Sequence, residues 1–181
     1  IPSVVADLTF HRRFSLGPLG GEGGLRLQTH SHWRSSDSIF DGLDADSIAD
    51  GRDLSRISAR IDWRRSFLLP MGIEATVLGE ASADAYTIAE DAVFAGKTTR
   101  SHAAAGVELR WPWVKASRSG AVHVIEPVVQ LVWAGSDDAG LPNEDSALVE
   151  FDEGNLFSLN RFPGSDAVEL GKRANVGISW T

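Results

Sequence analysis

Apolar and polar residues alternate along most of this chain. The run Ile57–Phe67 reads Ile-Ser-Ala-Arg-Ile-Asp-Trp-Arg-Arg-Ser-Phe, with mostly apolar side chains at odd positions and polar ones at even positions. A period of two over ten or more residues is typical of a β-strand with one apolar and one polar face. Similar runs recur, and they predict about seven strands, at residues 4–14, 24–34, 55–67, 73–88, 102–114, 121–133 and 173–181.

The connections between these strands alternate between short and long. The short ones are 15–23, 68–72 and 115–120, and the long ones are 35–53, 89–99 and 135–172. Long strands with short turns at one end and long loops at the other are typical of outer-membrane β-barrels. The expected fold class is therefore all-β, an antiparallel up-and-down transmembrane β-barrel segment, with the short turns periplasmic and the loop 135–172 extracellular or lumenal.

A soluble β-sandwich also has alternating strands, and a sandwich that binds carbohydrate is one alternative. Sandwich strands are usually about 5–6 residues long, whereas most runs here extend further. The pattern therefore favours the barrel. A different outer-membrane barrel, such as a porin or a receptor, is the other alternative.

The polar faces of the predicted strands indicate a charged barrel lumen. The charged residues expected to face the lumen are Arg26, Arg34, Arg60, Arg64, Glu80, Arg110 and Glu126. Arg110 and Glu126 are equally far from the turn 115–120, and Arg60 and Glu80 bear the same relation to the turn 68–72. We therefore expect each of these two pairs to be cross-strand neighbours.

Tryptophans lie near the strand ends. Amphipathic indole rings favour the level of the lipid headgroups, so these residues are expected at the membrane interface. They are Trp33, Trp111, Trp113, Trp133 and Trp180.

Composition excludes several classes of function. The formal net charge of −8 argues against nucleic-acid binding, and the lack of cysteine excludes disulfides and thiolate metal sites. His30 and His32 share a strand face at a spacing that can bind a metal, but no third ligand is identifiable, so a polar barrel wall is preferred. No nucleophile motif is recognisable, and we expect no catalytic residue, no cofactor and no metal.

One part of the chain is specific enough to suggest a family. After a strand that contains Glu126-Pro127, the loop carries Asn-Glu-Asp-Ser and then Leu-Phe and Arg-Phe-Pro-Gly-Ser-Asp. This resembles the LPS-assembly outer-membrane protein family (LptD, also called organic solvent tolerance protein), in its central barrel segment and in an alphaproteobacterial form. The matching loop residues are Asn143, Glu144, Asp145, Ser146, Asn155, Leu156, Phe157, Arg161, Phe162, Gly164 and Asp166. Ala167 stands where the family usually has an arginine.

The resemblance implies a role in lipopolysaccharide transport. It implies a barrel of roughly 26 strands in the outer membrane of a Gram-negative bacterium, surrounded by outer-membrane lipid. The implied partners are lipopolysaccharide, an LptE-like plug lipoprotein inside the barrel and the periplasmic bridge proteins that deliver the lipid. The strands that form the family's lateral gate are not expected in this chain, which begins at Ile1 as a piece of a longer protein would. The loop is expected to fold over or into the barrel mouth, with Arg161 and Asp166 bonded to strand-end backbone or to lumenal carboxylates.

Overall fold

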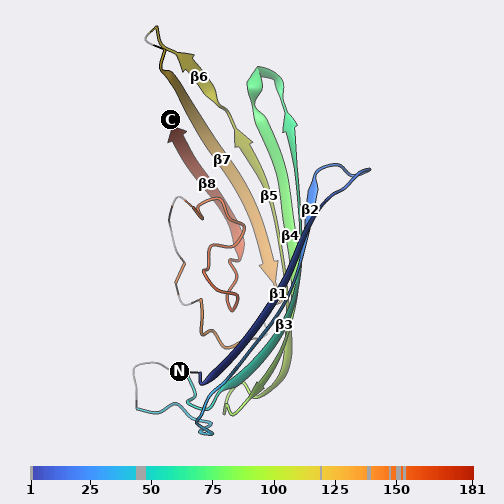
Figure 1. Cartoon of the computed structure of the whole chain (residues 1–181), viewed down its shortest axis with the longest axis vertical. Helices are drawn as coiled ribbons and strands as arrows, with labels where there is room; N and C mark the ends of the chain where they lie inside the picture. The colour runs from blue at the N-terminus through green and yellow to red at the C-terminus, as the bar shows by residue number, and fades with distance from the viewer. Residues whose placement is uncertain are drawn as a thin grey trace.

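A computed structural model shows a chain whose regular secondary structure is almost entirely β-strand (Figure 1). It describes residues 2–43, 48–118, 120–137, 140–146, 148–149, 152 and 154–181. The strands are β1 Val4–Ser15, β2 Glu22–Trp33, β3 Asp53–Leu68, β4 Glu74–Ala89, β5 Gly96–Arg110, β6 Trp113–Ala116, β7 Val122–Ser136 and β8 Gly171–Trp180. A short 3-10 turn, η1 Pro70–Gly72, joins β3 to β4.

All eight strands belong to one antiparallel sheet. β1 to β5 follow one another as a meander, and β7 then pairs with β5 and β6 on one edge and with β8 on the other. In the described part of the chain β1 and β8 are not paired with each other, so the sheet is open. The two-layer sandwich alternative is not supported, because the strands form a single sheet.

The number of strands differs from the expectation. The run 102–114 was expected to be one strand, but the structure divides it into β5 and β6. The interruption lies at Trp111 and Pro112. Proline has no backbone N–H to donate to a ladder, which makes it a natural breaking point within a strand. Both pieces pair with the same partner strand, so the sheet continues past the break.

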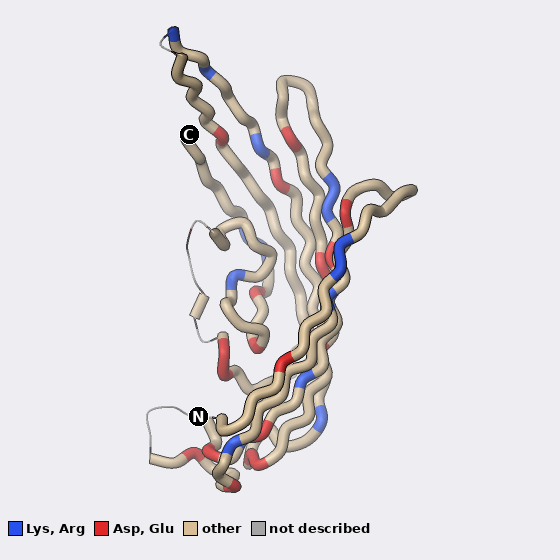
Figure 2. The backbone as a smooth tube through the Cα atoms, in the orientation of Figure 1, with Lys and Arg blue, Asp and Glu red and all other residues tan. Residues whose placement is uncertain are grey.

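The sheet has two chemically different faces. One face, here called the polar face, carries Arg26, Arg60 and Glu108, and the opposite face, here called the apolar face, carries residues such as Leu27 and Val107. The apolar face is open to the surroundings: Leu8 is 70 % exposed, Ile57 64 % and Ile178 72 %. Figure 2 shows charged residues along the strands and in the segments that connect them. In the described part of the chain, no helix is long and apolar enough to span a bilayer.

The buried hydrophobic cluster is small and lies on the polar face near the long connections. Leu54, Tyr86 and Ile88 form it, and Phe94 and Leu141 pack against it. Leu54 and Ile88 are direct cross-strand partners on β3 and β4, which brings their side chains together. Most of the other buried side chains on the polar face are themselves polar or charged. They include Arg56, Arg100, His102 and Gln130.

The expected strand register is wrong by two residues at two of the three short connections, 68–72 and 115–120. Arg60 lies opposite Ser82 rather than Glu80, and Arg110 lies opposite Val128 rather than Glu126. The cause is the position of each turn. Leu69 N–H donates to Ile73 C=O at 2.7 Å, and Met71 and Gly72 take up left-handed φ angles of 67° and 77°.

That turn is therefore centred on Met71, one residue later than equal spacing of Arg60 and Glu80 assumes. Moving a turn centre by one residue moves the register by two, so every side chain stays on its expected face. Arg110 still reaches Glu126 diagonally, with Nη1 3.0 Å from Oε1. No such contact joins Arg60 and Glu80 among the described residues.

Candidate functional site

The long connection between β7 and β8 folds back against the polar face of the sheet. Figure 1 shows this segment, coloured orange to red, on the side toward which the strands curve. Its described residues contact β3, β5 and β7 through side-chain hydrogen bonds and ion pairs. The candidate functional site consists of this docked loop and the part of the polar face that it leaves open.

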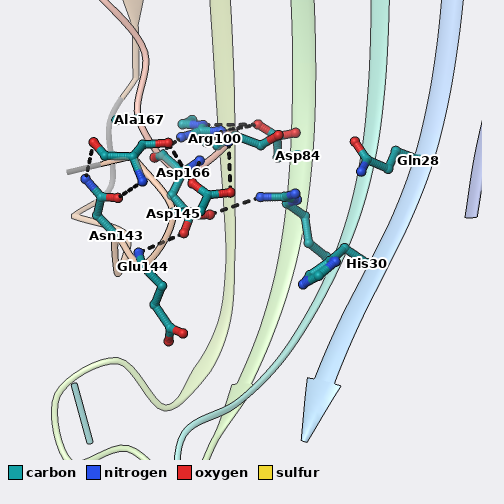
Figure 3. A network of polar contacts seen from close by, with 12 residues as sticks. Gln28, His30, Asp84, Arg100, Asn143, Glu144, Asp145, Asp166 and Ala167 are labelled. Atoms are coloured by element: carbon teal, nitrogen blue, oxygen red, sulfur yellow. Dashed lines mark hydrogen bonds and ion pairs between the residues drawn. The ribbon is translucent and has the colours of Figure 1, made fainter. Parts of the chain in front are cut away.

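A buried pair of arginines holds the end of the loop (Figure 3). Arg56 Nη1 lies 3.0 Å from Asp166 Oδ1, and both side chains are buried. Arg100 donates from Nε and Nη2 to Asp84 Oδ2 at 3.0 and 2.7 Å. Its remaining donors reach the backbone oxygens of Asp166 and Ser165 at 2.5 and 2.6 Å. A planar guanidinium is suited to this role because it can satisfy several acceptors at fixed angles.

The turn at Asn143–Ser146 is hydrogen-bonded to the same end of the loop, at Ser165 and Asp166. Asp145 accepts hydrogen bonds from the N–H groups of Ser165 and Asp166 at 3.0 and 2.9 Å. Asn143 and Ser146 bond to each other through side chain and backbone. The Asp145 carboxylate occupies the space that a Cβ would need at Gly164. Glycine at 164 therefore allows the backbone to approach the carboxylate this closely.

Glu144 connects the turn to a second group of arginines. Its carboxylate lies 2.9 Å from Arg34 and 3.0 Å from Arg52, and its own N–H donates to Asp166 Oδ2 at 2.9 Å. Arg52 also binds Asp91 at 2.5 Å, so the loop, the 34–52 connection and the 90–95 connection are tied together. Ion pairs that are buried and multiply bonded fix geometry more than they add net stability.

A third anchor lies further along the sheet, at the Leu156-Phe157 motif. Gln130 Nε2 donates to Phe157 C=O at 2.8 Å and to Glu108 Oε2 at 3.0 Å, while Asn175 Nδ2 donates to Gln130 Oε1 at 2.8 Å. The Phe157 ring packs on Gly177 of β8, where a Cβ would lie 2.9 Å from the ring. Leu156 lies beside it. The motif therefore docks on β8 at the position where Gly177 has no side chain.

The remaining motif residues shape the loop itself. Arg161 binds Glu169 through Nε at 3.0 and 2.9 Å and through Nη2 at 2.5 Å, and Arg173 of β8 binds the same carboxylate. Asn155 N–H donates to Asp152 Oδ1 at 2.8 Å. Phe162 N–H lies 3.4 Å from the side-chain oxygen of Asn160. We expected Arg161 and Asp166 to bond to strand-end backbone or to lumenal carboxylates. Instead, Asp166 binds the Arg56 guanidinium near the start of β3, and Arg161 binds Glu169 of the loop itself.

The two neighbouring loop aspartates have pKa values shifted in opposite directions. Burial raises the pKa of Asp166, and the nearby Asp145 carboxylate adds to the rise, against the opposing effect of the Glu144 N–H and Arg56. Burial also acts to raise the pKa of Asp145. Hydrogen bonds from the Ser146 hydroxyl and from the N–H groups of Ser165 and Asp166 outweigh it, so that pKa is lowered. The pKa values of these two neighbouring carboxyl groups are therefore shifted apart.

A cavity of about 440 Å³ remains open between the polar face and the tip of the loop. Of the charged residues expected to face inward, five line it, namely Arg26, Arg60, Arg64, Glu80 and Arg110. Glu126 is not among the lining residues, but it forms an ion pair with Arg110, which is. Arg34 lies apart from the cavity, at the end of β2, with Glu144.

The tryptophans lie mainly on the apolar face. Trp33, Trp113, Trp133 and Trp180 are between 42 and 74 % exposed. Trp111 packs edge-on against Trp113, with ring centroids 5.1 Å apart, and its indole N–H donates to Met71 C=O at 3.1 Å. That hydrogen bond ties the break between β5 and β6 to the neighbouring turn η1.

The sequence pattern missed the residues that hold the loop in place. Arg56, Asp84 and Gln130 stand at even positions of predicted strands, so alternation put them on the polar face. Arg100 lies before the predicted strand 102–114, and only the structure places it in β5. Nothing in that pattern shows that a segment from beyond β7 covers them. Glu169, which binds Arg161 and Arg173, lies outside the motif that drew attention to the loop.

The two histidines of β2 have local partners. His30 Nδ1 lies 3.1 Å from Asp7 Oδ2, and His32 Nε2 lies 3.6 Å from Glu144 Oε2. Across the described residues, no group of three or more His, Cys, Asp or Glu side chains is arranged to hold a metal ion. The two rings face each other edge-on, with centroids 5.7 Å apart.

The chain was compared with models of known protein families and with curated proteins. The family model described as "LptD: LPS transport system D" matches residues 2–181, which is nearly the whole chain. No curated protein matches the sequence.

Proposed function

Because this chain belongs to the LptD family of LPS transport system D, we propose that it is part of the translocon that assembles lipopolysaccharide into the outer leaflet of a Gram-negative outer membrane. The match extends over residues 2–181, so the assignment rests on all of the strands and on the docked loop together. We further propose that the chain is a central barrel segment of an alphaproteobacterial member.

The single observation that carries the proposal is the contrast between the two faces of one open sheet. The apolar face leaves Leu8, Ile61, Val176 and Trp180 more than half exposed. Water-soluble monomers rarely expose so large a continuous apolar surface. The other face is polar and holds a docked polar loop. Lipid on one side and a water-filled lumen on the other match this arrangement.

The open edges support a larger barrel. Among the described residues, β1 is paired on its β2 side alone and β8 on its β7 side alone. A sheet cannot end in lipid with unpaired backbone groups, because each unsatisfied group costs several kcal/mol there. We therefore propose that further strands complete a barrel of roughly 26 strands. In that barrel the short turns are periplasmic, and the exposed tryptophans lie at the lipid headgroups.

The partners follow from the same arrangement. Outer-membrane lipid contacts the apolar face, and lipopolysaccharide passes on the polar side. An LptE-like lipoprotein plugs the lumen, and periplasmic bridge proteins deliver the lipid to the barrel. The docked loop already covers part of the polar face near β5 and β7, so a plug would meet the loop as well as the strands.

The membrane orientation can be tested by nitroxide labels on the full chain in liposomes. Labels at Ile57, Ile61 and Leu131 are expected to relax faster with a lipid-soluble agent than with a water-soluble one. Labels at Thr9 and Gln28, on the polar face, are expected to show the reverse preference. Equal access of both agents at all five positions would contradict the proposal that this sheet is a membrane wall.

The transport role needs a separate experiment, since a porin would give the same label pattern. A photo-crosslinking residue at Gln28 in the full chain, in living cells, is expected to capture lipopolysaccharide. The matched position Leu27, on the apolar face of the same strand, is expected to capture phospholipid. Absence of lipopolysaccharide adducts at Gln28 and at every other position of the polar face would favour a porin or receptor instead.

A further inference from the structure

Arg26 of β2 and Arg60 of β3 lie directly opposite each other on the polar face. Like charges in this position repel, so such a pair weakens the sheet unless something else compensates it. The contacts of the described residues give neither guanidinium an acidic partner within 4.0 Å. Arg64 lies four residues nearer the turn on the same face of β3, directly opposite Glu22. Among the described residues it too has no ion pair within 4.0 Å, since Glu22 binds Arg13 instead.

The neighbouring arginines show that the sheet does pair its charges elsewhere. Arg13 lies 2.9 Å from Glu22 and 2.7 Å from Asp62. Arg110 lies 2.7 Å from Glu108 and 3.0 Å from Glu126. Two of these acids, Asp62 and Glu108, line the same cavity, as Glu80 does, against five lining arginines. The cavity wall therefore keeps an excess of positive charge at Arg26, Arg60 and Arg64.

The unpaired guanidiniums border open space. All three arginines line the cavity of about 440 Å³, which is within the range of small-molecule sites. Arg26 and Arg60 also line a smaller cavity of about 40 Å³ on their other side. Ser58, which borders that smaller cavity, has a buried hydroxyl that finds no hydrogen-bond partner among the residues the structure describes. The loop residues Phe157 and Leu159 close the larger cavity opposite the sheet.

We propose that Arg26 and Arg60, with Arg64 beside them, bind a phosphate group carried by the saccharide that crosses this lumen. Guanidinium groups bind phosphate oxygens in pairs, and such hydrogen bonds are about twice as strong as neutral ones. Several convergent cations also suit the double negative charge of a phosphate monoester better than a single carboxylate. This inference rests on the proposed transport function, because the lumen supplies the ligand.

Direct binding to the full chain in detergent tests the site. The probes are the phosphorylated saccharide headgroup of lipopolysaccharide, the same headgroup after chemical dephosphorylation, and inorganic phosphate. The double variant Arg26→Gln/Arg60→Gln is expected to bind the phosphorylated headgroup about tenfold or more weakly than the unchanged chain. Its binding of the dephosphorylated headgroup is expected to be the same as that of the unchanged chain.

Arg12→Gln is the matched control, because Arg12 stands near the same level on the apolar face of β1. It is expected to leave all three affinities unchanged. Equal weakening by Arg12→Gln would overturn the site, and so would equal binding of both headgroups by the unchanged chain. Inorganic phosphate that binds as tightly as the phosphorylated headgroup would also overturn it, since the saccharide would then contribute nothing.

A stability measurement separates this role from a structural one. Removing the repulsion in Arg26→Gln/Arg60→Gln is expected to leave the unfolding midpoint of the full chain unchanged or higher. A lower midpoint would mean that the two arginines support the fold, and the proposal would fail. Failure of the transport role itself looks different. Lipopolysaccharide would then form no adduct at Gln28 in the unchanged chain, whereas failure of the phosphate site leaves that adduct intact.

Discussion

The guanidinium of Arg56 lies 3.0 Å from the carboxylate of Asp166, although 110 residues separate them along the chain. The contact joins the first part of β3 to the far end of the loop after β7. Asp166 also receives the Glu144 N–H at 2.9 Å, so one carboxylate connects the strand and two parts of the loop. The position of the loop on the polar face depends strongly on this pair.

Removing Arg56 alone is therefore expected to be costly. Arg56→Met leaves the buried Asp166 carboxylate without its cation, and the loss in free energy of unfolding is expected to be about 3–5 kcal/mol. Chemical denaturation of the full chain and protease digestion of the loop would both report it. The double variant Arg56→Met/Asp166→Asn keeps an acceptor for the Glu144 N–H and is expected to recover most of the loss. A double variant as unstable as the single one would contradict this account.

A side chain at residue 164 is expected to dislodge the loop. Gly164→Ala places a methyl group where the Asp145 carboxylate now lies, so the hydrogen bonds from Ser165 and Asp166 are lost. The expected cost is on the order of 2 kcal/mol, measured as faster proteolysis of the loop. Gly135→Ala is the control, because nothing lies within 4 Å of a Cβ built there. Similar digestion rates for the two variants would show that the close approach at 164 is unimportant.

Acid is expected to loosen the part of the loop around Glu169. Burial acts to raise the pKa of Glu169, but the Arg161 hydrogen bond and the charges of Arg173 and Arg161 outweigh it and lower that pKa. A carboxylate with a lowered folded pKa contributes stability above its unfolded pKa and loses it as pH falls through the folded value. The loss is therefore expected to begin as pH falls below the ordinary glutamate value of 4.5.

Protease accessibility of the loop between pH 7 and pH 3 would measure this effect. Glu169→Gln is expected to show a looser loop at pH 7 and a smaller change with acid. Asp166 acts in the opposite sense, because its pKa is raised, so its contribution is present at low pH and is lost as pH rises through the folded value. An acid response that is identical with and without Glu169 would assign the pH dependence to other groups.

A charged side chain introduced on the apolar face is expected to destabilise the protein in lipid. Leu27 is 45 % exposed on that face, in the middle of β2. Under the proposed orientation, Leu27→Arg places a cation in lipid and is expected to cost about 2–4 kcal/mol, the magnitude found near a bilayer midplane. Gln28→Arg, the next residue on the polar face, is the control and is expected to cost far less. Equal folding yields of the two variants in lipid would argue against a membrane-facing surface.

Alternation predicted much of the sheet, but not the details of its pairing. It placed Arg26, Arg60 and Glu108 on one face and Ile61, Val77 and Leu109 on the other, as the structure does. Side chains on a strand must alternate, so this division follows from sequence order alone. Register depended on where each turn is centred, and Met71 and Gly72 shifted one centre by a residue. Backbone angles of that kind leave no mark in a polarity pattern.

The sequence by itself determined which side chains share a face, because a strand's period of two is a local property of the backbone. It also contained the loop motif and the residues that match the family. Only the tertiary structure decided that Arg56 meets Asp166, that Phe157 fits over Gly177, and that Arg26 and Arg60 are opposite neighbours. These contacts join residues distant in the chain, and their geometry depends on turn positions and on the path of the loop.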